Sequence, residues 1–277
     1  MKNALSRLLL GALLLIVSAA RGGESADPEG SAVAGPVPRS AAPARAERVK
    51  VLSYNVHNGL GMDDERDYAR IGRIIRRSGA DVAAVQEVDS ATHRSAGRYV
   101  LGEIARAAGM RPLFGRAIAY DGGAYGIGIL CREEPLAVRR IALPGREEER
   151  LLLVAEFERF VFACVHLSLT EEDRLASAET ICAEARRSGK PFVLAGDWNA
   201  RPDEALLDRL REGGFRIVSD TAQPTFPADR PDECIDYVAL YDPAGRSAVV
   251  GRGRVVAEAV ASDHRPVEAT LKIGGGR

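Results

Sequence analysis

The chain has 277 residues, with 38 basic and 39 acidic side chains and a formal net charge of −1 at pH 7. That length is enough for a domain with a large buried core. Proteins that hold nucleic acid tightly usually carry a clear positive excess. The balanced charge therefore argues against a processive or tight DNA binder, although a local basic patch remains compatible with it.

The first twenty residues have the pattern of a secretory signal peptide. Lys2 and Arg7 precede an apolar run from Leu8 to Ala20, which ends in small residues suited to cleavage before Arg21. The run is shorter than the roughly 20 apolar residues that span a bilayer, and an uncleaved anchor is the alternative. We therefore expect a secreted or periplasmic protein that keeps no stable membrane span after processing.

Residues 21–47 are rich in Ala, Gly, Pro and Ser and predict a disordered tether. The folded domain is then expected over 48–273, and we expect it to be a monomer. The four cysteines lack metal-ligand spacing, and those at 131, 164 and 182 fall in apolar runs or on an apolar helix side. Buried free thiols are the first expectation, although export would permit disulfides.

Hydrophobic periodicity predicts short strands interspersed with helices. Strands are expected at 48–56, 81–88, 113–119, 126–131, 136–143, 150–157, 160–167, 192–196, 215–219, 235–240, 249–257 and 266–273. Helices are expected at 67–78, 97–109 and 203–210, and another after Thr170, with Asp173 completing a capping box. This order predicts an α/β fold of the α+β type: two packed, mostly antiparallel sheets with helices outside.

Polar side chains end several of the apolar strands. They are Asn55, His57, Glu87, His166, Asp197, Asn199, Asp236 and the run Ser262-Asp263-His264. Taken singly, each is more often a turn, a cap or a hydrogen-bonded structural residue. Gathered at one edge of a sandwich, they would form a site on a rigid scaffold.

The carboxylates and imidazoles in this set suit metal-assisted hydrolysis of a phosphate ester. Mg²⁺ (or Mn²⁺) prefers oxygen ligands and takes few protein groups, so Glu87, helped by Asn55 and Asp263, could hold it. Such an ion neutralises charge on the phosphoryl oxygens and the leaving group.

The remaining polar groups suit proton transfer and oxyanion binding. Asp236 paired with His264 would raise the basicity of the imidazole and fix its tautomer. Asp197 would orient or deprotonate the attacking water, while Asn199 and His166 would donate to the phosphoryl oxygens.

These motifs resemble those of the endonuclease/exonuclease/phosphatase superfamily. The matching runs are Ser-Tyr-Asn-Val-His (53–57), Gln-Glu-Val (86–88), His166, Gly-Asp-Trp-Asn (196–199), Ile-Asp-Tyr-Val (235–238) and Ser-Asp-His-Arg-Pro-Val (262–267). The resemblance covers about 48–273 and implies a four-layer α/β sandwich with the metal and catalytic roles given above. It leaves open whether Asp197 or the Asp236–His264 pair activates water.

Three further runs, at 89–95, 123–126 and 224–227, are similar to those of small secreted bacterial members of the superfamily. Arg94, in a loop after Glu87, is a candidate phosphate clamp, because Arg suits bidentate phosphate contacts, and a solvated loop Arg is the alternative. Tyr125 and His57 complete the candidate substrate-binding set. Many relatives read Gly-Asn after the Tyr, whereas this sequence reads Gly126-Ile127; if that Asn contacts substrate in relatives, the contact is in doubt here.

The sequence therefore predicts a divalent-metal-dependent hydrolase that cleaves a phosphodiester or phosphomonoester by in-line attack of an activated water. One alternative is an endonuclease or exonuclease acting on DNA or RNA, which the charge disfavours. The other is a non-catalytic module that binds phosphate ligands.

Overall fold

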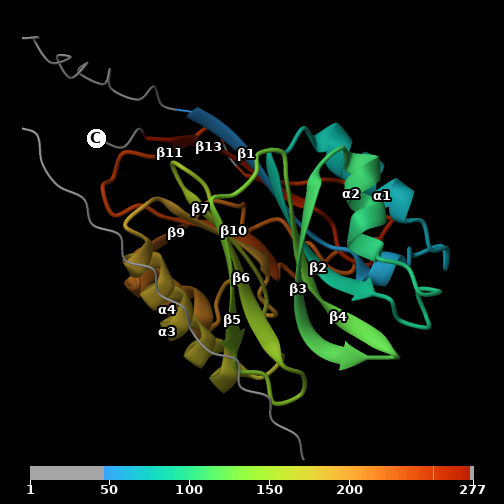
Figure 1. Cartoon of the computed structure of the whole chain (residues 1–277). Coiled ribbons are helices and arrows are strands. Elements are labelled where there is room, and N and C mark those ends of the chain that lie inside the picture. The colour runs from blue at the N-terminus through green and yellow to red at the C-terminus, as the bar shows by residue number, and fades with distance from the viewer. Residues whose placement is uncertain (1–46, 252, 275–277) are drawn as a thin grey trace, which may run out of the picture. The chain divides into compact units, whose positions relative to one another are not determined.

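The computed structural model describes residues 47–251 and 253–274. The predicted signal peptide, and the predicted tether up to residue 46, lie outside the described residues. The described chain forms two β-sheets packed face to face, with helices on the outer face of each sheet (Figure 1). None of its helices is long and apolar enough to span a membrane.

The first sheet has seven strands in the order β11-β13-β1-β2-β4-β3, with β12 also paired to β13. They are β1 (Glu47–Asn55), β2 (Val82–Ser90), β3 (Arg111–Tyr120), β4 (Gly123–Cys131), β11 (Ala248–Val249), β12 (Arg254–Val255) and β13 (Val267–Ile273). Strands β1 and β2 run parallel, and the other neighbours are antiparallel.

The second sheet has six strands in the order β5-β6-β7-β8-β10-β9. They are β5 (Ala137–Leu143), β6 (Arg150–Glu156), β7 (Val161–His166), β8 (Phe192–Asp197), β9 (Phe215–Ile217) and β10 (Asp236–Tyr241). Here β7 and β8 are the parallel pair. Each sheet thus has a central parallel pair, and its other strands run antiparallel to their neighbours.

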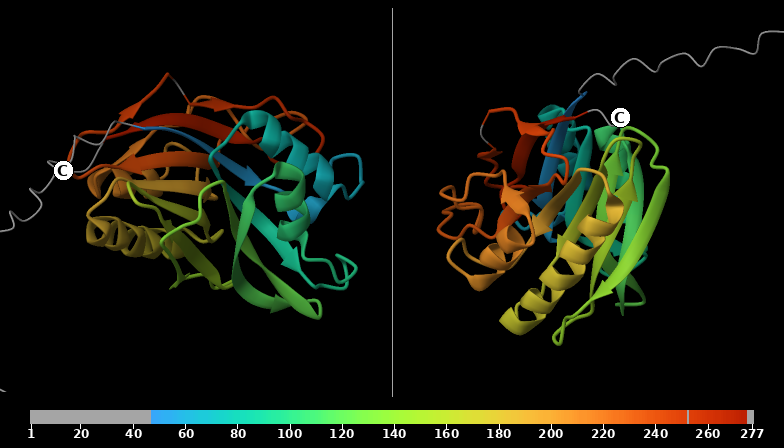
Figure 2. Two further views of the ribbon diagram at one scale, coloured as in Figure 1. Left: turned by 45° about the horizontal axis from the view of Figure 1, so that its top comes forward. Right: turned by 90° about the vertical axis from the view of Figure 1, so that its left-hand side faces the viewer.

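The helices divide between the two outer faces (Figure 2). Helices α1 (Tyr68–Ser78) and α2 (Val100–Ala108) pack on the first sheet, and a 3₁₀ turn, η1 (His57–Gly59), follows β1. Helices α3 (Glu171–Ser188) and α4 (Ala205–Glu212) pack on the second. This arrangement confirms the predicted four-layer sandwich.

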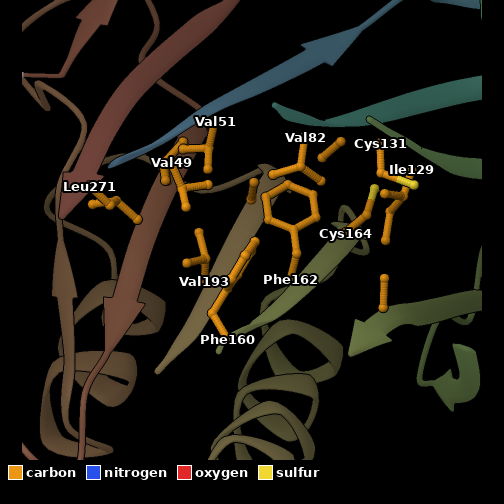
Figure 3. Packing of buried hydrophobic residues seen from close by; sticks show 14 of the residues in the cluster. Val49, Val51, Val82, Ile129, Cys131, Phe160, Phe162, Cys164, Val193 and Leu271 are labelled. Carbon is orange, nitrogen blue, oxygen red and sulfur yellow. The ribbon is translucent and has the colours of Figure 1, made fainter. Parts of the chain in front are cut away.

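The alternation of side chains along each strand builds three apolar layers from two sheets. In β1, Val49 and Val51 face the second sheet, whereas Leu52 and Tyr54 face the helices. Figure 3 shows the layer between the sheets, where Phe162 from β7 lies among side chains of both sheets. Burial on both faces explains the nearly continuous apolar runs of the central strands.

Most predicted elements are present with boundaries shifted by a few residues, and two expectations were wrong. The strand expected over 249–257 is two short strands, β11 and β12, which pair separately with β13. Thr170 does precede α3 but makes no side-chain capping bond. Asp173 instead accepts charge-assisted hydrogen bonds from Arg146, which are stronger than a neutral cap. All four cysteines are free and buried, as expected.

Candidate active site

The register of the second sheet sets three predicted residues side by side. His166 ends β7 opposite Asp197, which ends the parallel strand β8. On the other side of β8, the antiparallel register places Asp236 opposite Asp197. The three polar side chains therefore lie in a row across neighbouring strands, and all three are buried.

The close approach of β7 and β8 depends on a glycine. A Cβ at Gly196 would lie 2.2 Å from the carbonyl oxygen of Val165, which is closer than real Cβ atoms come. Any side chain there would push the two strands apart, and with them His166 and Asp197. The glycine of the Gly-Asp-Trp-Asn run therefore positions the site without contacting it.

The first sheet contributes Asn55 from β1 and Glu87 from β2. The pairing of β2 with β4 shifts register between Val85 and Val88, which marks a β-bulge. Glu87 sits in this bulge with a φ of 60°, in the left-handed region. Bulges redirect side chains next to active sites. Here Glu87 turns towards Asn55, while Gln86 stays buried and lies 3.4 Å from the Cys164 sulfur.

Asn55 joins the two sheets. Its amide nitrogen donates to Glu87 at 2.9 Å and to Asp197 Oδ2 at 3.0 Å. Its amide oxygen accepts the backbone N–H of His57 at 3.1 Å. In this conformation Asn55 orients the carboxylates of both sheets, and its predicted service as a metal ligand stays a prediction.

His264 completes the buried cluster. Its Nδ1 lies 2.9 Å from Asp236 Oδ2, so the predicted pairing of these residues is present. Its Nε2 lies 3.7 Å from Asp197 Oδ2, and the Phe226 ring packs against the imidazole with centroids 4.8 Å apart. Asp197, Asp236 and His264 each place a ligand atom within 4.8 Å of the others.

The burial of these charges sets their pKa values. Burial raises the pKa of Asp197 to about 7, and the neighbouring Asp236 charge acts in the same direction. Burial lowers the pKa of His264, but the Asp236 and Asp197 charges outweigh it and raise the value to about 10. For His166, burial, the Arg150 charge and His264 all lower the pKa well below its ordinary value. At neutral pH His264 is thus cationic and His166 neutral.

Asp263 lies next to this cluster and is partly exposed. Ser262 Oγ is 2.8 Å from the Asn55 carbonyl oxygen and 3.3 Å from Asp263 Oδ1, which ties the loop before β13 to β1. His57 Nδ1 is 3.7 Å from Asp263 Oδ2. The structure therefore places the predicted residues Asn55, His57, Glu87 and Asp263 on one connected set of contacts.

The donor set at this edge fits a divalent cation. Glu87 and Asp263 offer partly exposed carboxylates, which are the hard oxygen ligands that Mg²⁺ and Mn²⁺ prefer. The buried carboxyl atom Asp236 Oδ1 has no hydrogen-bond partner among the described residues, so negative charge here is only partly compensated. Since Asp236 and His264 already hold each other, Glu87 and Asp263 are the better candidates to hold the ion.

The remaining predicted residues lie around this cluster. Asn199 donates its amide nitrogen to the Leu167 carbonyl oxygen at 2.9 Å and has a φ of 48°. Tyr125 lies buried in β4. Arg94 is bound by both oxygens of the buried Asp89, at 2.7 and 2.8 Å, and is therefore not a free phosphate clamp.

Two residues that the sequence analysis did not select lie beside His166. Arg150 begins β6 and Glu148 precedes it, and both line a recess that His166 and Tyr125 also line. A charged residue at the start of an otherwise apolar strand was the available signal for Arg150.

The chain belongs to the endonuclease/exonuclease/phosphatase family, whose model matches residues 52–264. The family comprises hydrolases that act on phosphoester bonds. No curated protein is significantly similar in sequence.

Solved structures share the fold at low identity. The endonuclease/exonuclease/phosphatase from Bacteroides vulgatus has a TM-score of 0.68 and 19% identity, with coverage of 82% of this chain and 99% of that one. The mannosyl-6-phosphatase Bt3783 of Bacteroides thetaiotaomicron has a TM-score of 0.64 and 19% identity, with coverage of 80% of this chain and 99% of that one. D. rerio TDP2, complexed with single strand DNA product, has a TM-score of 0.64 and 20% identity, with coverage of 81% of this chain and 99% of that one.

Proposed function

We propose that this protein is a divalent-metal-dependent phosphoesterase that hydrolyses a phosphate ester by in-line attack of water. The observation that carries the proposal is the position of Asp197, whose Oδ2 lies within 3.7 Å of Asn55, His166 and His264 nitrogens. A buried carboxylate surrounded by nitrogen groups from both sheets is suited to orient one water and accept its proton.

The other residues have complementary roles. His264, held by Asp236, presents positive charge to a phosphoryl oxygen, and neutral His166 donates a hydrogen bond to another. Held by Glu87 and Asp263, a divalent cation such as Mg²⁺ or Mn²⁺ would neutralise charge on the phosphoryl and leaving-group oxygens.

A panel of phosphate monoesters and diesters, assayed with Mg²⁺ or Mn²⁺ and with chelator, tests the proposal. We expect chelation to abolish turnover and Glu87→Gln to lower kcat/KM at least about 100-fold, because the variant loses a charged metal ligand. Glu158→Gln, in an exposed turn before β7, makes the same charge change and should keep wild-type activity. Full activity in chelator or in Glu87→Gln would falsify the proposal, and tight ester binding without turnover would favour a binding module.

A nuclease is the second candidate, because TDP2 with bound single-stranded DNA product shares the fold. The net charge of −1 provides no overall attraction for a polyanion. Nicking of plasmid or trimming of a single-stranded oligonucleotide at low salt would establish it. The absence of cleavage at micromolar enzyme would remove it.

A further inference from the structure

A small recess adjoins the candidate active site on the side of His166. The centre of a water molecule can move over about 10 Å³ inside it, which is room for one water or one hydroxyl group. Polar side chains line one part of it, namely Tyr125, Glu148, Arg150 and His166, and the rest comes from β3, β4 and Leu151. None of the steps proposed above uses Arg150 or Glu148.

Arg150 is unusual because its guanidinium is buried and incompletely bonded. Only 7% of its side chain is exposed. One terminal nitrogen lies 3.1 Å from Glu148 and the other 3.7 Å from Glu147, while Nε has no hydrogen-bond partner among the described residues. Buried donors of this kind are normally satisfied, and the guanidinium therefore keeps donor capacity that its two ion pairs do not use.

Glu147 and Glu148 differ in how many hydrogen-bond partners their carboxylates have. Glu147 accepts hydrogen bonds from Ser168 Oγ and from the backbone N–H of Leu169, in the loop that follows β7. Those bonds fix the segment before β6 against the strand that ends in His166. Glu148 lines the recess, and within the described chain its ion pair is with Arg150.

The charges around the recess select the chemistry of its occupant. Arg150 is a donor and Glu148 an acceptor, so a group that both donates and accepts can satisfy them together. A second phosphate would face the Glu148 carboxylate, and an apolar group would leave the polar lining atoms unpaired. A hydroxyl group meets both requirements and fits the volume.

We propose that Glu148 and Arg150 form a subsite for a hydroxyl group of the substrate, so that the enzyme prefers phosphate esters of polyhydroxylated alcohols. This proposal rests on the proposed phosphoesterase function and names its substrate class. A site built to hydrogen-bond a hydroxyl rejects the analogue that lacks it, because its own polar groups are then left unpaired.

Matched esters test the subsite. Glycerol 3-phosphate and propyl phosphate differ only in two hydroxyl groups, and the methyl diesters of both cover the diester case. With Mn²⁺ present, we expect the wild-type enzyme to prefer the glycerol ester at least about tenfold in kcat/KM. In Glu148→Gln this ratio should fall to near one, since the acceptor charge is removed at almost constant volume.

The exposed neighbour Glu149 provides the control, because Glu149→Gln makes the same charge change outside the recess and should keep the wild-type ratio. Turnover of both esters without preference, or a ratio that Glu148→Gln leaves unchanged, overturns the subsite and leaves the phosphoesterase intact. If no ester is hydrolysed with metal, the proposed function fails and the subsite fails with it.

Discussion

Arg94 shows how a buried partner changes the role of a single residue. Its guanidinium holds Asp89, whose side chain is 1% exposed, through two hydrogen bonds and lies 4.5 Å from the centre of the Tyr120 ring. Thr92 also donates to Asp89 at 3.0 Å. The pair therefore fixes the loop after β2, and its charge is already compensated.

We expect Arg94→Met to lower the free energy of unfolding by about 3 kcal/mol, because it leaves a buried carboxylate without its counter-charge. Urea unfolding measures the change. Arg98→Met is the control, since Arg98 makes an exposed contact with Glu103 at 3.4 Å and a distant one with the Tyr68 ring at 6.0 Å, so the change should cost less than about 0.5 kcal/mol. Unchanged stability with a raised KM in Arg94→Met would restore the phosphate clamp.

The same residue separates what the sequence could and could not predict. Residues such as His166, Asp197 and Asp236 were identifiable because each lies at one end of an apolar strand, and these strand ends meet at one sheet edge. The pairing of Arg94 with Asp89 could not be identified from the sequence, because strand alternation does not indicate where a loop folds back. The turn of Glu87 depends on a bulge that only the pairing of β2 with β4 creates.

At the scale of elements, the segment between β5 and β6 holds the start of α3. The backbone N–H of Arg146 and its guanidinium both donate to Asp173, at 2.9 to 3.2 Å. The capping box expected for this helix failed because this long-range pair took the acidic residue. The helix start is thereby tied to the same segment that carries Glu148.

This tie predicts a pH dependence of stability. The side-chain and backbone hydrogen bonds from Arg146 lower the pKa of Asp173 below its ordinary value of 3.8. The folded state thus binds its proton less readily, so the stabilisation is present above pH 3.8 and disappears as pH falls through the lowered pKa. We expect Asp173→Asn to be less stable than wild type at pH 7.

Thermal unfolding of both proteins at pH 7 and at pH 3 measures the gap in stability between wild type and Asp173→Asn. We expect this gap to be smaller at pH 3. Glu172→Gln, an exposed neighbour 3.9 Å from Arg146, removes the same charge without those hydrogen bonds and should produce a smaller gap at pH 7. An equal gap for Asp173→Asn at both pH values would show that Asp173 stabilises the fold through packing and not through its charge.

At the scale of the whole molecule, the candidate site exists only where the two sheets meet. Asn55 and Glu87 come from the first sheet, while His166, Asp197 and Asp236 come from the second. Asn55 contacts Asp197 directly across the interface. The apolar layer between the sheets must therefore hold the two halves of the site in register.

Two phenylalanines on neighbouring strands test this coupling. Phe162 in β7 packs between the sheets, and Phe192 in β8 packs against the outer helices; both side chains are fully buried. Either change to Ala should cost about 3–5 kcal/mol of unfolding free energy, measured in urea. Only Phe162→Ala should also lower kcat, by about tenfold or more, because the cavity loosens the alignment of catalytic groups from the two sheets. Equal kcat in both variants would mean that contacts at the site itself, such as Asn55 to Asp197, are sufficient to hold the sheets in register.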